Sequence, residues 1–174
     1  MLDHPRATPA SDSLSLPCKL AGLEPGAARP RNGVVYDSPV LGRMQFFELP
    51  GGVASFWCAT QPIAGTPFAL QITCQVEGQQ FPGAGHEARL VALRRSQAQE
   101  TAAARTLINA GLRDLRLPYV VSAADLVLTS IHLPPRPLFD ARDERIYRCT
   151  SAPVLSFALT FVLGTPISAY IDRG

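Results

Sequence analysis

The chain has almost no lysine: of its 16 basic residues, Lys19 is the one lysine and the rest are arginines. The 16 basic residues are nearly balanced by 14 acidic ones, so a net charge of +2 gives no overall field that would attract nucleic acid or an anionic membrane. No apolar run reaches the roughly 20 residues that cross a bilayer, and the first residues lack the pattern of a secretory signal. We therefore expect a cytoplasmic protein that binds neither nucleic acid nor membrane.

Sequence signatures of common catalytic and cofactor sites are also missing. The chain has no GxSxG, no HExxH, no Gly-rich phosphate loop and no calcium-loop pattern. Its four cysteines are spaced 40, 16 and 75 residues apart, without the CxxC pair that chelates a metal or forms a redox couple. We expect no metal, no cofactor and, in a reducing compartment, no disulfide.

Prolines gather in the first part of the chain, where no apolar period is sustained. Residues 1–38 are predicted to be a proline-rich arm that is partly flexible. The remaining residues, 39–174, are predicted to form a single domain, because 174 residues in all leave room for one ordinary core.

Short alternating runs, then one long helical pattern, then alternating runs again predict the fold. The helix is expected over residues 86–115, which are rich in Ala, Leu, Arg, Gln and Glu and contain no proline. Period-two alternation predicts the strands GRMQFFEL, VASFWCAT, FALQITCQVE, ADLVLTSIHL, ERIYRCT, VLSFALTFVL and PISAYID. This order of strands, helix and strands predicts an α+β fold, with one antiparallel sheet or more and the helix packed on a face.

The same patterns predict which side chains are buried. In the strand FALQITCQVE, Ile72 and Cys74 are expected in the core, with Gln71 and Thr73 in water. Alternate residues of VLSFALTFVL, from Leu155 to Leu163, are expected to share a core face. Gln97 and Glu100 interrupt the apolar side of the helix, which predicts a break or a partly exposed central turn.

Only weak candidates for catalysis are present. His86 and Glu87, near the start of the helix, are an acid–base candidate by residue type, although a solvated first helical turn explains them as well. Cys58 and Cys74 are expected close together on adjacent strands, with His86 as a base, but a thiol on an apolar strand face usually behaves as a small hydrophobic group. We therefore expect the protein not to be an enzyme.

Three features are candidates for binding a partner. Trp57, the one tryptophan, lies either on an exposed sheet face or between two covered faces. Arg94 and Arg105 repeat at 11 residues, close to three helical turns, and form either a docking stripe or a solvated helix face. The run from Asp140 to Arg145 is predicted to be a loop whose acids Asp140, Asp143 and Glu144 are either simply solvated or an acidic patch for a basic partner.

The order of these elements resembles small bacterial α+β domains encoded beside polymorphic or contact-dependent toxins as immunity proteins. The resemblance covers about residues 40–174 and includes the closing sequence VLSFALTFVLGTPISAYIDRG. It implies a protein that binds a cognate toxin and blocks its active site. Two alternatives remain open: an adaptor or chaperone for a secreted effector that docks through the N-terminal arm, and a small cysteine-dependent enzyme.

Overall fold

The structure, a computed structural model, describes residues 29–49, 54–77, 80–135 and 142–172. Most of these residues lie in eight strands and one long helix, α2 (Ala84–Asp114). The strands are β1 (Arg29–Ser38), β2 (Gly42–Glu48), β3 (Ser55–Pro62), β4 (Ala69–Val76), β5 (Leu126–Leu133), β6 (Arg142–Cys149), β7 (Ser156–Val162) and β8 (Thr165–Asp172).

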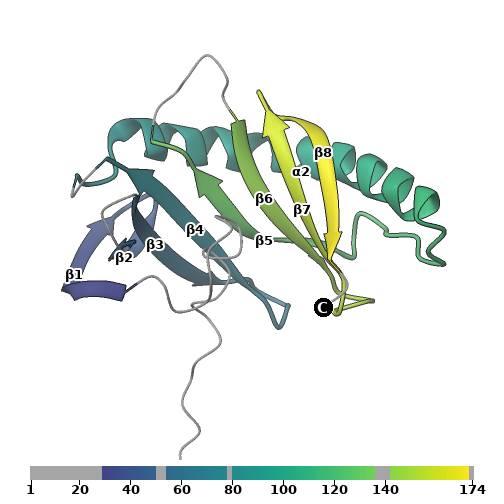
Figure 1. The fold of residues 1–174 in the computed structure, drawn as a ribbon, viewed down its shortest axis with the longest axis horizontal. Helices are drawn as coiled ribbons and strands as arrows, with labels where there is room; N and C mark the ends of the chain where they lie inside the picture. The colour runs from purple at the N-terminus through teal and green to yellow at the C-terminus, as the bar shows by residue number, and fades with distance from the viewer. Residues whose placement is uncertain (1–28, 50–53, 78–79, 136–141, 173–174) are drawn as a thin grey trace, which may run out of the picture.

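All eight strands belong to one sheet, and their order in space follows their order in the chain. Each neighbouring pair is antiparallel except β4 and β5, which are parallel. Two antiparallel four-stranded meanders therefore meet at a parallel seam. A parallel pair needs a long crossover connection, and α2 is part of the one between β4 and β5. Figure 1 shows α2 running across one face of the sheet.

The α+β class, and the order of strands, helix and strands, agree with the expectation from sequence, while the sheet is larger than expected and mixed rather than antiparallel. The expected arm is too long: its last ten residues, Arg29–Ser38, pair with β2 as strand β1. The rest of the arm, residues 1–28, lies outside the described residues. The predicted loop over Asp140–Arg145 is also corrected, because β6 begins at Arg142.

The hydrophobic core lies between α2 and the sheet. Registered positions on neighbouring strands, such as Phe46, Trp57 and Cys74, share the face that the helix covers. From α2 the core receives five apolar side chains: Leu90, Leu93, Ala104, Ile108 and Leu112. Burial of residues of this size contributes about 1.5–3 kcal/mol for each large one, which makes this contact the main tie between helix and sheet. Among the described residues no helix is both long enough and apolar enough to cross a membrane.

The helix does not break at Gln97 and Glu100, so the first of the two alternatives expected from sequence is wrong, whereas Gln97 is exposed, as the second alternative expects. Glu100 is buried, and its carboxylate pairs with Arg145 of β6, whose side chain is only 2% exposed. Asp143 holds the same guanidinium from β6, with its Oδ1 atom 2.8 Å from Arg145 Nε. The polar interruption in the apolar side of α2 is therefore filled by a buried ion pair, and the helix continues across it.

Two other burial predictions are wrong. Gln71 and Thr73 were expected in water, yet both are buried on the sheet face away from α2. Leu163 was expected in the core but is 77% exposed, because the chain turns there: Leu163 and Gly164 both have positive φ, and Val162 pairs with Thr165. Leu155, Phe157, Leu159 and Phe161 are buried as expected.

Candidate functional site

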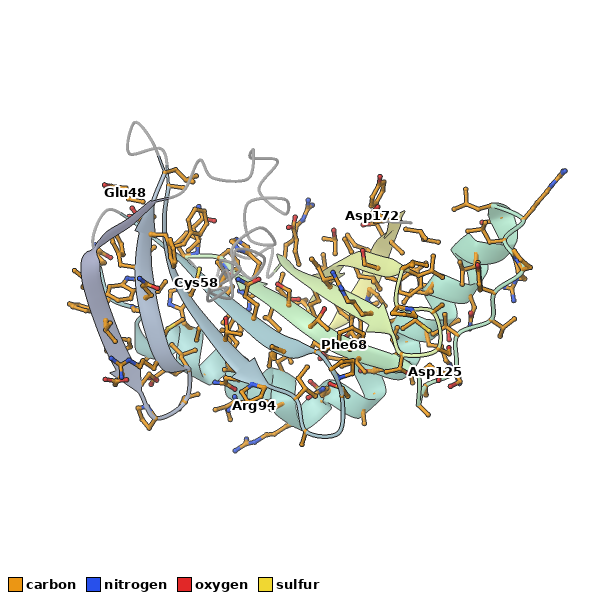
Figure 2. The ribbon with its side chains drawn as sticks, turned by 90° about the horizontal axis from the view of Figure 1, so that it is seen from below. Glu48, Cys58, Phe68, Arg94, Asp125 and Asp172 are labelled. Atoms are coloured by element: carbon orange, nitrogen blue, oxygen red, sulfur yellow. The ribbon has the colours of Figure 1, made fainter. Side chains whose placement is uncertain are left out.

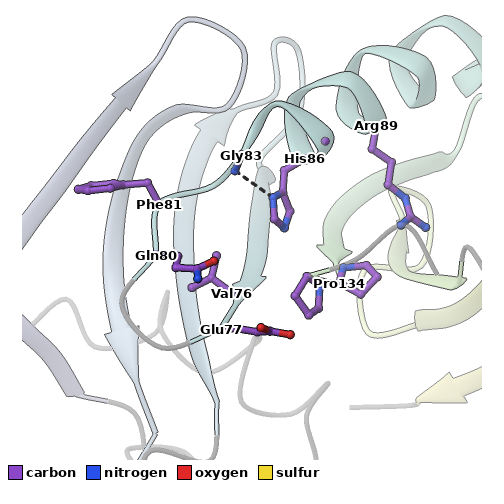
Figure 3. Close-up of a pocket in the computed structure, with 10 residues that line it drawn as sticks. Val76, Glu77, Gln80, Phe81, Gly83, His86, Arg89 and Pro134 are labelled. Carbon is purple, nitrogen blue, oxygen red and sulfur yellow. Dashed lines mark hydrogen bonds between the residues drawn. The ribbon is translucent and has the colours of Figure 1, made fainter.

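A cavity of about 330 Å³ opens where the parallel seam meets the start of the helix. Because β4 and β5 are parallel, their carboxyl ends lie at the same edge of the sheet, and α2 begins beside them. Ligand sites in sheets with parallel strands commonly lie beyond such carboxyl ends, next to the crossover helix. We call this cavity the crossover pocket; Figure 3 shows the residues around it.

The crossover pocket has an apolar part. Val76, Phe81, Pro134 and Pro135 line it. Phe81 is 57% exposed, yet its ring is held in place by stacking on Trp57, with ring centroids 5.1 Å apart, and by a tilted contact with Tyr36 at 5.4 Å. An exposed aromatic ring with rigid support loses little conformational entropy when it is covered, which suits it to binding.

His86 projects from the first turn of α2 into the wall of the pocket, but both of its ring nitrogens have partners. Nδ1 lies 3.3 Å from the backbone N–H of Gly83, which donates to it, and Nε2 lies 3.1 Å from the carbonyl oxygen of Gln75. This pattern fits a neutral ring that carries its proton on Nε2. Burial lowers the pKa of His86, so the ring stays neutral at pH 7. Its role is to cap α2 and join it to β4.

Arg89 is the cation of the pocket. Its Nη2 donates to the carbonyl oxygen of Arg142 at 3.2 Å and lies 3.6 Å from Asp143 Oδ2. The side chain is about one-fifth exposed, and within the described residues Nε and Nη1 have no acceptor. A guanidinium has five N–H donors in a planar fork, so Arg89 can donate to a carboxylate in the pocket.

Two glycines leave room at the start of α2. Gly83 and Gly85 line the pocket, and a Cβ added to either would meet no heavy atom within 4 Å. Neither glycine has a positive φ. They are therefore not required by the backbone conformation, and their effect is to keep this side of the pocket open.

A second cavity, of about 350 Å³, adjoins the first along α2, and Arg89 lines both. The buried charges Glu100, Asp143 and Arg145 lie in its wall, and the exposed Leu163 stands at its rim. Arg145 is fully engaged, with two carboxylates and with the ring of Phe161, whose centroid is 3.8 Å from its Cζ atom. The charges in this second cavity therefore hold the fold together.

The structure does not bring the predicted partner-binding residues together, and two of them are corrected. Trp57 is 1% exposed and donates its indole N–H to the carbonyl oxygen of Gln80 at 2.8 Å, so the covered alternative holds. Asp143 is buried in its pair with Arg145. Because Trp57 and Asp143 are buried in the folded chain, neither side chain can contact a binding partner. Asp140 lies outside the described residues.

The other three predicted residues lie apart. Arg94 is exposed on α2 and donates to the carbonyl oxygen of Val40 and to Gln61 Oε1, each at 3.3 Å, so it ties the helix to the first meander. Arg105 is half-buried, about three turns further along α2. Glu144 is half-buried on the sheet face away from α2, where burial raises the pKa of its carboxyl.

The two strand cysteines do not meet. Cys74 is registered with Trp57 beneath α2, whereas Cys58 is registered with Thr73 and lies on the opposite face (Figure 2). Burial raises the pKa of the Cys74 thiol to about 12, so this thiol is protonated at neutral pH. Glu87 does not act with His86 either, since it accepts a hydrogen bond from Ser38 Oγ at 2.6 Å. No group of three or more His, Cys, Asp or Glu within the described residues is arranged to hold a metal ion.

Sequence reasoning missed Phe81, Pro134 and Pro135 as residues of the site. The signal was present in part, because FPGAG marks a break directly before the helix and the proline run ends a strand. Their meeting depends on the parallel pairing of β4 with β5, which the alternating pattern does not reveal.

Comparisons of the chain with protein-family models, with curated proteins and with solved structures give no match.

Proposed function

We propose that this chain is a binding protein that neutralises a cognate bacterial toxin by covering its active site, without catalysis of its own. The expectation of a toxin as partner comes from the resemblance in element order. The use of binding in place of catalysis is supported by the chemistry of the crossover pocket and of the cysteines.

One observation carries the proposal: the exposed ring of Phe81 rests on a rigid aromatic cluster beside a cavity that also presents Arg89. Aromatic side chains, phenylalanine among them, and arginine are enriched in protein interfaces relative to the rest of the surface. A partner that covered Phe81 would remove its apolar ring from water without having to order it first.

His86 and Cys74, the groups considered for catalysis, are both used by the fold itself. His86 holds the start of α2 through both ring nitrogens. The Cys74 thiol, with its pKa at about 12, lies beneath the helix and carries too little thiolate for nucleophilic chemistry at neutral pH. Both observations favour binding over the cysteine-dependent alternative.

Coexpression with the product of the adjacent gene tests the proposal. We expect a complex that copurifies and protects cells from that product, and a Phe81→Ala variant that protects less. Arg113→Gln, an exposed change near the far end of α2, is the matched control and should protect fully. Failure of the wild type to copurify or to protect would overturn the proposal.

A further inference from the structure

We propose that the crossover pocket binds the C-terminal residue of a partner polypeptide, with an apolar side chain against Phe81 and the prolines and the free carboxylate at Arg89. This inference rests on the proposed binding function and adds the chemical class of the group that is recognised.

The volume and the apolar lining set the size and the character of the ligand. A cavity of about 330 Å³ is at the lower end of the range of about 300–1,000 Å³ for small-molecule pockets, and so accommodates a group of about one residue. Val76, Phe81, Pro134 and Pro135 offer it apolar surface. An apolar side chain placed there would exclude water from a ring that is now mostly exposed.

The charge in the pocket sets the polar group. Arg89 has donors without acceptors among the described residues, and its planar fork matches a carboxylate. Figure 3 shows Arg89 and Glu77, the acid of the lining, on opposite sides of Pro134 in this view.

The closeness of these two parts points to a chain terminus. An Asp or Glu side chain supplies a carboxylate without an apolar group, and a Leu or Phe within a chain supplies an apolar group without a carboxylate. A C-terminal apolar residue has both on the same Cα atom. Capture of a C-terminal carboxylate is a recurring mode of peptide recognition.

Peptide binding to the full chain tests the inference. The probe is the acetylated peptide Gly-Gly-Ser-Gly-Phe with a free carboxylate, titrated while the amide signals of Gly83 and Gly85 are followed by NMR. We expect saturable shifts at these glycines and at least fivefold weaker binding of the same peptide with a C-terminal amide. Equal binding of acid and amide, or no binding of the acid, would overturn the inference.

Variants test whether the carboxylate of the peptide binds to Arg89. We expect Arg89→Gln to weaken binding of the acid about fivefold or more and to leave that of the amide unchanged. Arg95→Gln, a change to an exposed arginine of the same helix that does not line the pocket, is the matched control and should bind as the wild type. Equal binding by wild type and Arg89→Gln would overturn the role of Arg89.

Gly85→Leu separates binding from folding. The new side chain would enter open space in the pocket, and leucine favours the helix more than glycine does. We expect an unchanged or higher melting temperature together with loss of peptide binding. Normal peptide binding by this variant would overturn the placement.

Two further arms identify the source of the ligand and separate the two proposals. Binding of phenylacetate as tight as that of the peptide would assign the pocket to a free aromatic acid and overturn the chain-terminus inference. Peptide binding without copurification or protection would leave the pocket assignment standing and remove the toxin proposal. Protection without peptide binding would leave the toxin proposal standing and remove the pocket assignment.

Discussion

Arg145 of β6 and Glu100 of α2 form an ion pair beneath the middle of the helix, where both side chains are largely buried. Ser96 donates to the other oxygen of Glu100 at 2.6 Å, and Asp143 binds the same guanidinium through both of its oxygens. Each of these buried charges therefore has a partner of opposite sign. Breaking a buried pair of this kind leaves an isolated charge in the interior, which costs much more than losing a surface pair.

Removal of either partner should destabilise the fold. We expect Glu100→Gln to lower the free energy of unfolding by about 2–3 kcal/mol, and Arg145→Met by about 4 kcal/mol because two buried carboxylates then lose their shared cation. Urea unfolding at pH 7 measures both. Asp114→Asn, at the exposed end of α2, is the control, with an expected change below about 0.5 kcal/mol. Equal losses in Glu100→Gln and this control would contradict the prediction.

The local pattern of the sequence predicted the elements well and their connection poorly. Alternation located β2 to β8, although β6 begins two residues before the predicted strand, and composition located α2 to within two residues at its start and one at its end. It did not reveal that β4 pairs with β5 in parallel, because strand pairing depends on contacts between residues that are far apart in the chain. The crossover pocket is a product of that pairing, so its residues could not be predicted.

Burial, too, was predicted well where it depends on the local pattern and poorly where it depends on residues far apart in the chain. Leu163 continues the alternation of β7 but lies in the turn, and a two-residue turn with positive φ turns its side chain into solvent. Glu100 was expected to break the helix or to leave its central turn partly exposed, because its partner Arg145 is 45 residues away in the chain and the local sequence does not reveal it. A charged residue in an apolar stripe is evidence of a buried partner as much as of exposure, and only the tertiary structure distinguishes the two.

Stability should fall as the solution is acidified below pH 6.5. Burial is the main cause that lowers the pKa of both His86 and His132 from the ordinary value of 6.5. The unfolded chain therefore takes up protons at a higher pH than the folded chain does. The stability that the neutral histidines contribute is complete above pH 6.5 and is lost as the pH falls through 6.5 towards the lowered values.

The variant His86→Gln/His132→Gln isolates this effect. Glu144 acts in the opposite direction, because its raised pKa gives a contribution that is lost as pH rises, but it is present in both proteins and cancels in their difference. We expect the difference in unfolding free energy between wild type and double variant to shrink from pH 7.5 to pH 5.5. A difference that is constant with pH would contradict the assignment.

Thiol reactivity should separate the cysteines. With a pKa of about 12, only about one Cys74 in ten thousand is a thiolate at pH 8. We expect iodoacetamide to leave Cys74 and the buried Cys149 unmodified in the folded protein and to modify both in urea, as measured by peptide mass spectrometry. Half-buried Cys58 should react before either of them. Fast modification of Cys74 in the folded protein would restore it as a candidate nucleophile.

Two glycines with nearly the same backbone conformation should differ in their response to alanine. Gly65 and Gly164 have φ of +75° and +78°, so a side chain at either is strained by about 1–2 kcal/mol. At Gly65 the new Cβ meets nothing within 4 Å, whereas at Gly164 it would lie 2.8 Å from Glu100 Oε1. That oxygen is not free to move away, because Ser96 and Arg145 hold its carboxylate. We expect Gly164→Ala to lower the unfolding free energy by at least about 1 kcal/mol more than Gly65→Ala in urea titrations.

If Glu100→Gln is already present, the carboxamide is held less firmly, and the excess cost at Gly164 should shrink. Equal costs for the two glycines in the wild-type background would mean that Glu100 yields, and that its ion pair is looser than its burial implies.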